Sequence, residues 1–322
     1  MMDRVTVFEM PSLYRDSLRI TGYRFGEGEK TACIVGSMRG NEVQQLYCCS
    51  RIVRALSELE EEGRIAEGKS IMVIPCVNTY SMNTGKRFWP TDNSDINRMF
   101  PGYSLGETTQ RIAAGLFERI NDYEYGMQFA SFYIPGDFCP HVRLMRTGFE
   151  SVESAKLFGL PYVIVADPEP YDTTTLNYNW QIWEAKAFSL YTRTTSRIDK
   201  PSASIVIDGV MRFLNRIGAI RCPWKAGSVS DVIDEADLMS VKTDMSGIFE
   251  STVGDDAWVF RGDVLAHVID PYDGSIREAI RAPEDGVVFF QHSDPLIYAD
   301  TIAFKLIPVG DFGKEHILEE EM

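Results

Sequence analysis

The stretch "TACIVGSMRGNEVQQLYCC", residues 31–49, predicts a strand, a glycine turn and the start of a helix. Its apolar first part, 31–36, has the length of a buried strand. Apolar residues then recur at helical spacing until Gly63, which ends the predicted helix. Between strand and helix lies the glycine turn "GSMRGNE" (36–42), which brings the carboxylate of Glu42 to the junction. Since ligands bind where strands of α/β sheets end, this turn is a candidate site.

A second apolar run, 70–77, follows the helix, so strand, helix and strand form a βαβ unit with parallel strands. Further apolar runs predict strands over 126–134 and 161–167, and periodic stretches predict helices over 107–120 and 208–220. The pattern indicates an α/β fold whose mixed, mainly parallel sheet carries helices on both faces. The candidate ligand site is then the edge where the glycine turn and the segment after residue 77 meet.

The character of the sequence changes at about residue 223, where short β-like runs alternate with turns. We therefore predict an α/β domain over 1–222 and a β-rich domain with an acidic tail over 223–322. Two similar segments, "RGDVLAHVID" (261–270) and "YADTIAFKLI" (298–307), resemble the small barrel-sandwich domains of lipoyl and biotinyl carriers. No lysine matches the carrier hairpin tip, so neither lipoyl nor biotin is expected.

Composition excludes several classes of function. The 322 residues are 44% hydrophobic and 25% charged, as is usual for globular proteins, and the net charge is −15. Such a charge argues against nucleic acid as a partner, because that binding depends on neutralising phosphates. No apolar run is long enough for a membrane span, and the first residues lack a signal-peptide core, so we predict a cytoplasmic protein without membrane contact. The six cysteines form no C-x-x-C pair and are interpreted as reduced core thiols.

Three segments, "GSMRGNE", 78–102 and 126–146, resemble in order and wording the succinylglutamate desuccinylase/aspartoacylase family of zinc hydrolases. The resemblance covers nearly the whole chain and implies a zinc carboxypeptidase-like fold. The most specific match is "DINRMFPG" (95–102), because the substrate-binding segment of the family has the form D-x-N-R-x-F-P-G. It implies substrate-binding roles for Asn97 and Arg98.

The resemblance also implies a reaction, the hydrolysis of the amide bond of an N-acyl amino acid. In the family, zinc is held by His, Glu and a later His, and it lowers the pKa of a bound water molecule. A glutamate acts as general base, and arginines hold the substrate carboxylate. Arg87 corresponds to an arginine that contacts the oxyanion or substrate. The expected cofactor is therefore zinc, and the expected partner is a small anionic substrate.

The sequence departs from this pattern at most of the metal and base positions. In the family motif G-x-H-G-(N/D)-E, Arg39 takes the place of histidine, whereas Glu42 is kept. Ala130 stands at or next to the second histidine, and Tyr191 replaces the general-base glutamate. Arginine has no free lone pair with which to bind zinc. The candidate catalytic residues are Arg87, which matches the family, and Tyr191, which stands at the general-base position.

Replacement groups are available nearby. His141 and Cys139 form a C-x-H pair that has suitable chemistry for zinc together with Glu42, while a pocket-lining His141 is the alternative. Glu184 and Asp137 are candidate bases by proximity only. Alternatively, the guanidinium of Arg39 pairs with Glu42 and occupies part of the volume of the metal.

Arginines are dense around the predicted site although the chain is acidic. Besides the two arginines that match the family, Arg87 and Arg98, three others are candidates for binding a carboxylate: Arg39, Arg143 and Arg146. Two hypotheses remain open. The protein is either a metal-dependent deacylase with a rebuilt site or a catalytically inactive homologue that binds a small carboxylate or acyl-amino-acid ligand. Assembly into a homo-oligomer is compatible with either.

Overall fold

The computed structural model describes residues 3–11 and 16–308. The chain divides into two compact units, one of residues 1–131 and 140–232, the other of 132–139 and 233–322. The division falls after residue 232 rather than after 222, because the Asp231 amide donates to the Pro161 carbonyl at 2.9 Å and holds the chain to the larger unit. The segment 132–139 was not predicted to join the smaller unit.

The larger unit is built on one nine-stranded sheet, with the strand order β1-β2-β4-β3-β5-β9-β7-β8-β10. The strands are β1 (Asp3–Met10), β2 (Leu18–Phe25), β3 (Gly28–Ser37), β4 (Gly68–Cys76), β5 (Tyr125–Phe129), β7 (His141–Met145), β8 (Tyr162–Ala166), β9 (Lys186–Tyr191) and β10 (Asp231–Asp234). The pairs β3–β4, β3–β5, β5–β9 and β7–β8 are parallel, whereas β1–β2, β2–β4 and β7–β9 are antiparallel. The mixed, mainly parallel sheet that the sequence predicts is confirmed.

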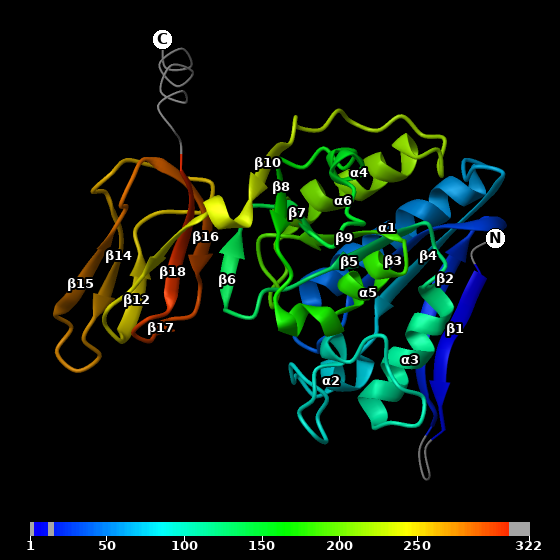
Figure 1. The fold of residues 1–322 in the computed structure, drawn as a ribbon, viewed down its shortest axis with the longest axis horizontal. Coiled ribbons are helices and arrows are strands. Elements are labelled where there is room, and N and C mark those ends of the chain that lie inside the picture. The colour runs from blue at the N-terminus through cyan, green and yellow to red at the C-terminus, as the bar shows by residue number, and fades with distance from the viewer. Residues whose placement is uncertain (1–2, 12–15, 309–322) are drawn as a thin grey trace. The chain divides into compact units, whose positions relative to one another are not determined.

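Helices cover both faces of this sheet (Figure 1). They are α1 (Val43–Glu61), α2 (Thr79–Asn83), α3 (Thr108–Ile120), α4 (Val152–Lys156), α5 (Leu176–Ile182) and α6 (Lys200–Arg216), with the short 3-10 helices η1 (Ile96–Arg98) and η2 (Pro170–Thr174). Helices α1 and α6 pack with Ile34 in one apolar cluster, and α3 and α5 pack with Val35 in the other. Successive residues of β3 are thus buried on opposite faces, which explains its continuous apolar run.

Two predicted elements have other bounds in the structure. The strand expected over 126–134 ends at Phe129, because the chain leaves the sheet and enters the smaller unit at residue 132. The helix expected over 208–220 begins at Lys200, where the Asp199 side chain caps it by accepting from the Ser202 amide at 3.3 Å. The antiparallel strands β1, β2 and β7 were not predicted.

The smaller unit contains two antiparallel sheets, β11-β18-β16-β13 with β6 beside β16, and β15-β14-β12-β17. Its strands are β6 (Gly136–Phe138), β11 (Met239–Lys242), β12 (Gly247–Ser251), β13 (Trp258–Val259), β14 (Val264–Ile269), β15 (Ile276–Arg281), β16 (Gly286–His292), β17 (Leu296–Ile297) and β18 (Ile302–Pro308), with the 3-10 helix η3 (Glu235–Asp237). The two similar sequence segments form β14 and β18, whose Val268 and Phe304 share one apolar core. The predicted acidic tail lies outside the described residues.

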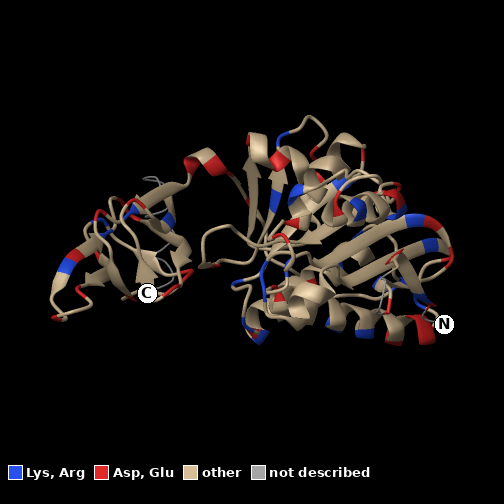
Figure 2. Ribbon diagram, turned by 90° about the horizontal axis from the view of Figure 1, so that it is seen from below, with Lys and Arg blue, Asp and Glu red and all other residues tan. Residues whose placement is uncertain are grey.

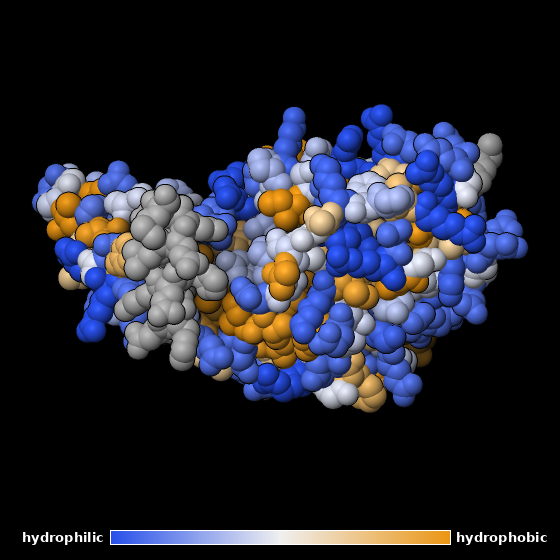
Figure 3. All heavy atoms as spheres, turned by 90° about the horizontal axis from the view of Figure 1, so that it is seen from above, coloured by the Kyte–Doolittle hydropathy of each residue, from blue (hydrophilic) through white to orange (hydrophobic). Residues whose placement is uncertain are grey.

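The surface carries mixed charge. Acidic and basic residues are interspersed along the ribbon rather than gathered in one basic band in the view of Figure 2. Apolar side chains reach the face drawn in Figure 3 in groups separated by hydrophilic ones. Within the described residues, no helix combines the length and the apolar character that crossing a bilayer requires.

Thiol labelling tests the packing of the core. Five of the six cysteines are buried, and only Cys222 is partly exposed. Burial raises the pKa of Cys48 and of Cys76 to about 12, so neither forms thiolate near neutral pH. We expect Ellman's reagent to titrate one thiol in the native protein and all six in denaturant. A Cys222→Ser variant should show none in the native state, and rapid labelling of several native thiols would contradict this packing.

Candidate functional site

The glycine turn between β3 and α1 places Glu42 in the interior, where the residue is 1% exposed. One carboxylate oxygen accepts from the backbone amides of Met38 at 2.8 Å and Arg39 at 3.0 Å. The other accepts from the Ser131 hydroxyl at 2.5 Å and from Nη1 of Arg39 at 3.1 Å. Four donors therefore satisfy this acid, as a buried carboxylate requires.

Arg39 is buried as well, at 6% exposure, and its guanidinium lies between two acids. Nε and Nη2 donate to Oδ2 of Asp95 at 3.0 and 2.7 Å, while Nη1 also donates to the Ser131 hydroxyl at 3.0 Å. Burial on its own would lower the pKa of Arg39, but the charges of Glu42 and Asp95 outweigh it and raise the pKa above the usual range. The predicted pairing of Arg39 with Glu42 is confirmed. Asp95 was missed as a partner, although it is the first residue of "DINRMFPG".

Arg87 lies near the same cluster. Its carbonyl accepts from the Gly40 amide at 2.9 Å, which joins the segment after α2 to the glycine turn. Burial and the charge of Arg39 lower the pKa of Arg87. The charges of Glu42 and Asp95 act in the opposite direction, but the pKa remains lowered. The largest cause is burial, which disfavours a charged side chain away from water.

The residues of "DINRMFPG" fix the loops beside this cluster. Asp95 caps η1 by accepting from the Asn97 amide at 3.0 Å. The side-chain oxygen of the buried Asn97 accepts from Nε2 of Gln128 in β5 at 3.0 Å. Arg98 donates to the Tyr171 carbonyl at 2.6 Å and also contacts Asp172 at 3.4 Å. Asn97 and Arg98 thus have structural partners, and the Arg98 side chain remains 30% exposed.

The antiparallel pair β7–β9 brings together other predicted residues. His141 lies opposite Tyr191, and the two rings stack with their centroids 4.5 Å apart. Arg143 lies opposite Ser189, whose hydroxyl accepts from the side-chain nitrogen Nδ2 of Asn177 at 2.5 Å. Because alternate residues of a strand share a face, these four strand residues lie on one face of the sheet. Ser189 and Asn177 carried no signal in the sequence.

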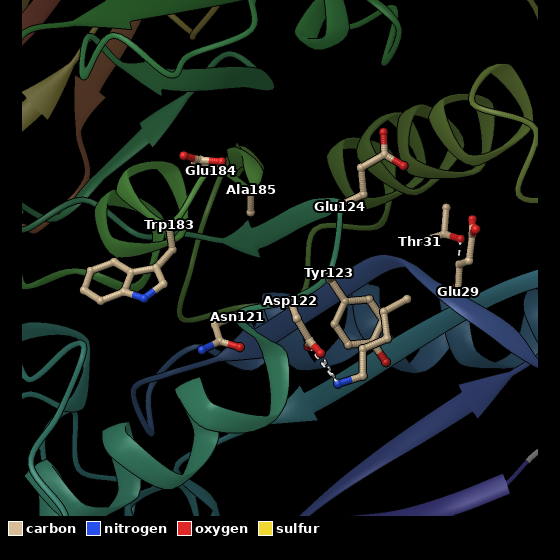
Figure 4. Close-up of a pocket in the computed structure, with 10 residues that line it drawn as sticks. Glu29, Thr31, Asn121, Asp122, Tyr123, Glu124, Trp183, Glu184 and Ala185 are labelled. Carbon is tan, nitrogen blue, oxygen red and sulfur yellow. Dashed lines mark hydrogen bonds and ion pairs between the residues drawn. The ribbon is translucent and has the colours of Figure 1, made fainter.

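One alternative base, Glu184, lies at the opposite end of the strands from Glu42, which corrects the proximity argument for this residue. Glu184 precedes β9 and lines a cavity of about 570 Å³ with Glu29, Asp122 and Trp183 (Figure 4). That cavity lies at the ends where β3, β5 and β9 begin, whereas Glu42 follows the end of β3. Asp137 belongs to β6 of the smaller unit.

The remaining candidates from 126–146 are also accounted for. Arg146 forms an exposed ion pair with Asp167 at 2.7 Å. The Cys139 thiol lies in the smaller unit and donates to the Val288 carbonyl at 3.3 Å.

Comparisons with known proteins identify the family. The sequence model of the succinylglutamate desuccinylase/aspartoacylase catalytic domain matches residues 28–217, more than half of the chain. The chain belongs to the succinylglutamate desuccinylase/aspartoacylase family. Among its relatives is the N-alpha-acetyl-L-2,4-diaminobutyric acid deacetylase of Halomonas elongata, which is 25% identical over 288 residues that cover 84% of this chain and 79% of the relative.

Solved structures of this family share the fold. A succinylglutamate desuccinylase from a Silicibacter species superposes with a TM-score of 0.79 at 19% identity, covering 94% of this chain and 93% of its own. The product-bound ectoine utilization protein of Ruegeria pomeroyi gives a TM-score of 0.79 at 19% identity, with 95% and 94% coverage. These likenesses extend over the β-rich part of the chain and confirm the predicted fold class.

The residues of this family member do not fit the zinc site that the resemblance implies. In the part of the chain that the structure describes, no three His, Cys, Asp or Glu side chains gather as metal ligands would. The hypothesis of a metal on Glu42 and His141 therefore gains no third ligand from these residues. Arg39 stands where the resemblance implies the first ligand, and Glu42 already accepts four hydrogen bonds.

Proposed function

We propose that this protein binds a small N-acylated amino acid at the carboxyl ends of β3, β5 and β9, and that it does not hydrolyse the ligand with a zinc-bound water. The observation that carries the proposal is the position of Arg39. Its guanidinium, held by Glu42 and Asp95, takes the first metal-ligand position of the family motif, whereas the substrate-side Arg87 and Arg98 are retained.

The position of Arg87 supports an anionic ligand. Its carbonyl accepts from the Gly40 amide at 2.9 Å, so Arg87 lies next to the glycine turn. Arginine stays protonated in proteins, so a ligand carboxylate beside Arg87 would gain charge-assisted hydrogen bonds. The acyl and amino acid classes follow the names of the relatives, which act on N-acetyl diaminobutyric acid and succinylglutamate.

Ligand-induced stabilisation tests the proposal. We expect N-acetyl-L-2,4-diaminobutyric acid, succinylglutamate or N-acetylaspartate to raise the thermal midpoint, because a ligand at about 100 times its Kd adds about 2.7 kcal/mol of stability. The Arg87→Gln variant should lose most of this shift. The Arg54→Gln variant, which removes an exposed arginine on α1, should keep it. If none of the three compounds shifts the midpoint of the unmodified protein, this ligand class is wrong.

Deacylation by other groups is the second candidate, favoured by the match of the chain to a catalytic domain. Tyr191 takes the general-base position and stacks on His141, so it is the residue to test. Release of free amine from the same three compounds, measured with and without chelator, distinguishes the candidates. Turnover that resists the chelator and is lost in Tyr191→Phe would favour the deacylase, whereas binding without amine release favours the binding protein.

A further inference from the structure

We propose that the guanidinium of Arg39 replaces the metal ion of this family as a permanent, built-in cation, and that the site takes up no zinc. A metal ion bound in the manner that the family motif implies would join the glycine turn to the end of β5. Arg39 makes the same connection with hydrogen bonds. This inference concerns the construction of the site and does not depend on the ligand proposed above.

The contacts of Arg39 reach three separate chain segments. It donates to Glu42 within its own turn, to Asp95 at the start of η1, and to Ser131 two residues after β5 ends. The last two partners are 56 and 92 residues away in sequence. A guanidinium has five N–H donors. Four of them are used here, one on Nε, two on Nη1 and one on Nη2.

These contacts also exclude a metal ion. Each carboxylate oxygen of Glu42 already accepts from two donors. For each oxygen, one of the two donors belongs to Arg39. A divalent cation would have to displace these donors while lying beside a buried guanidinium of like charge, which costs free energy. Since arginine does not deprotonate in proteins, its positive charge remains in the site at every physiological pH.

Metal analysis tests the inference directly. We expect the full-length protein, purified from zinc-supplemented medium, to contain far less than one zinc per chain. Its thermal midpoint should be the same in excess chelator and in excess zinc. Stoichiometric zinc, together with a lower midpoint after chelation, would overturn the inference. Ligand binding is measured separately, so either proposal can fail without the other.

A converse variant tests whether Arg39 occupies the position of the metal. The double substitution Arg39→His and Ala130→His places histidine at the first departed family position and at or next to the second, and it keeps Glu42. We expect this variant to gain about one zinc per chain and a midpoint that zinc raises and chelator lowers. The matched control, Arg54→His with Ala130→His, retains Arg39 and should gain neither. A folded double variant that takes up no zinc would contradict the positional equivalence, and if it fails to fold, metal analysis of the unmodified protein still decides.

Discussion

Replacing Arg39 with methionine is expected to lower the free energy of unfolding by about 3–5 kcal/mol, the range for removing one partner of a buried ion pair. Methionine keeps much of the side-chain volume but removes every N–H donor. Glu42 then loses its cation while it remains buried, and Asp95 loses two hydrogen bonds. Chemical denaturation followed by circular dichroism measures the change.

Two further variants make this prediction specific. Arg54→Met removes an ion pair with Glu58 in which both side chains are mostly exposed, so its effect should stay below about 1 kcal/mol. Adding Glu42→Gln to Arg39→Met removes the stranded charge and should recover part of the lost stability. If Arg39→Met unfolds at the same denaturant concentration as the unmodified protein, the cluster contributes no net stability.

Gly40→Ala is expected to destabilise the protein by about 3 kcal/mol, at the upper end for overpacking. A methyl group at Gly40 would lie 2.2 Å from the Lys86 carbonyl oxygen and 2.5 Å from the Met82 amide nitrogen. These are backbone atoms that cannot rotate away, so the turn and the segment after α2 must separate. That movement breaks the hydrogen bond between the Gly40 amide and the Arg87 carbonyl, and ligand binding should weaken in parallel.

Gly254→Ala is the matched control, since an added methyl group there would meet no heavy atom within 4 Å. We expect the control to unfold within about 1 kcal/mol of the unmodified protein. The thermal midpoint and the ligand-induced shift should be measured on both variants. A Gly40→Ala protein that matches the control in both would show that the close approach of the two segments is dispensable.

The pattern of apolar residues along the sequence was sufficient to predict the βαβ core, the mixed sheet, the two helical layers and the β-rich part of the chain. These features depend on periodic burial, which is encoded within a few neighbouring residues. The sequence also allowed the pairing of Arg39 with Glu42 to be predicted, because three residues of one turn separate them. The departures at Arg39, Ala130 and Tyr191 follow from the resemblance of the sequence to the motifs of the family.

The partners of the other site residues can be read only from the folded structure. Asp95 and Ser131 reach Arg39 only because β3 and β5 end, and η1 begins, close to one another in the fold. His141 stacks on Tyr191, and Cys139 packs in the smaller unit, because the chain crosses to that unit between β5 and β7. Contacts between distant segments depend on strand order and chain crossings, which local periodicity does not encode. For that reason the sequence raised the question of the missing zinc ligands, and the packing around Arg39 supplied the physical basis for an answer.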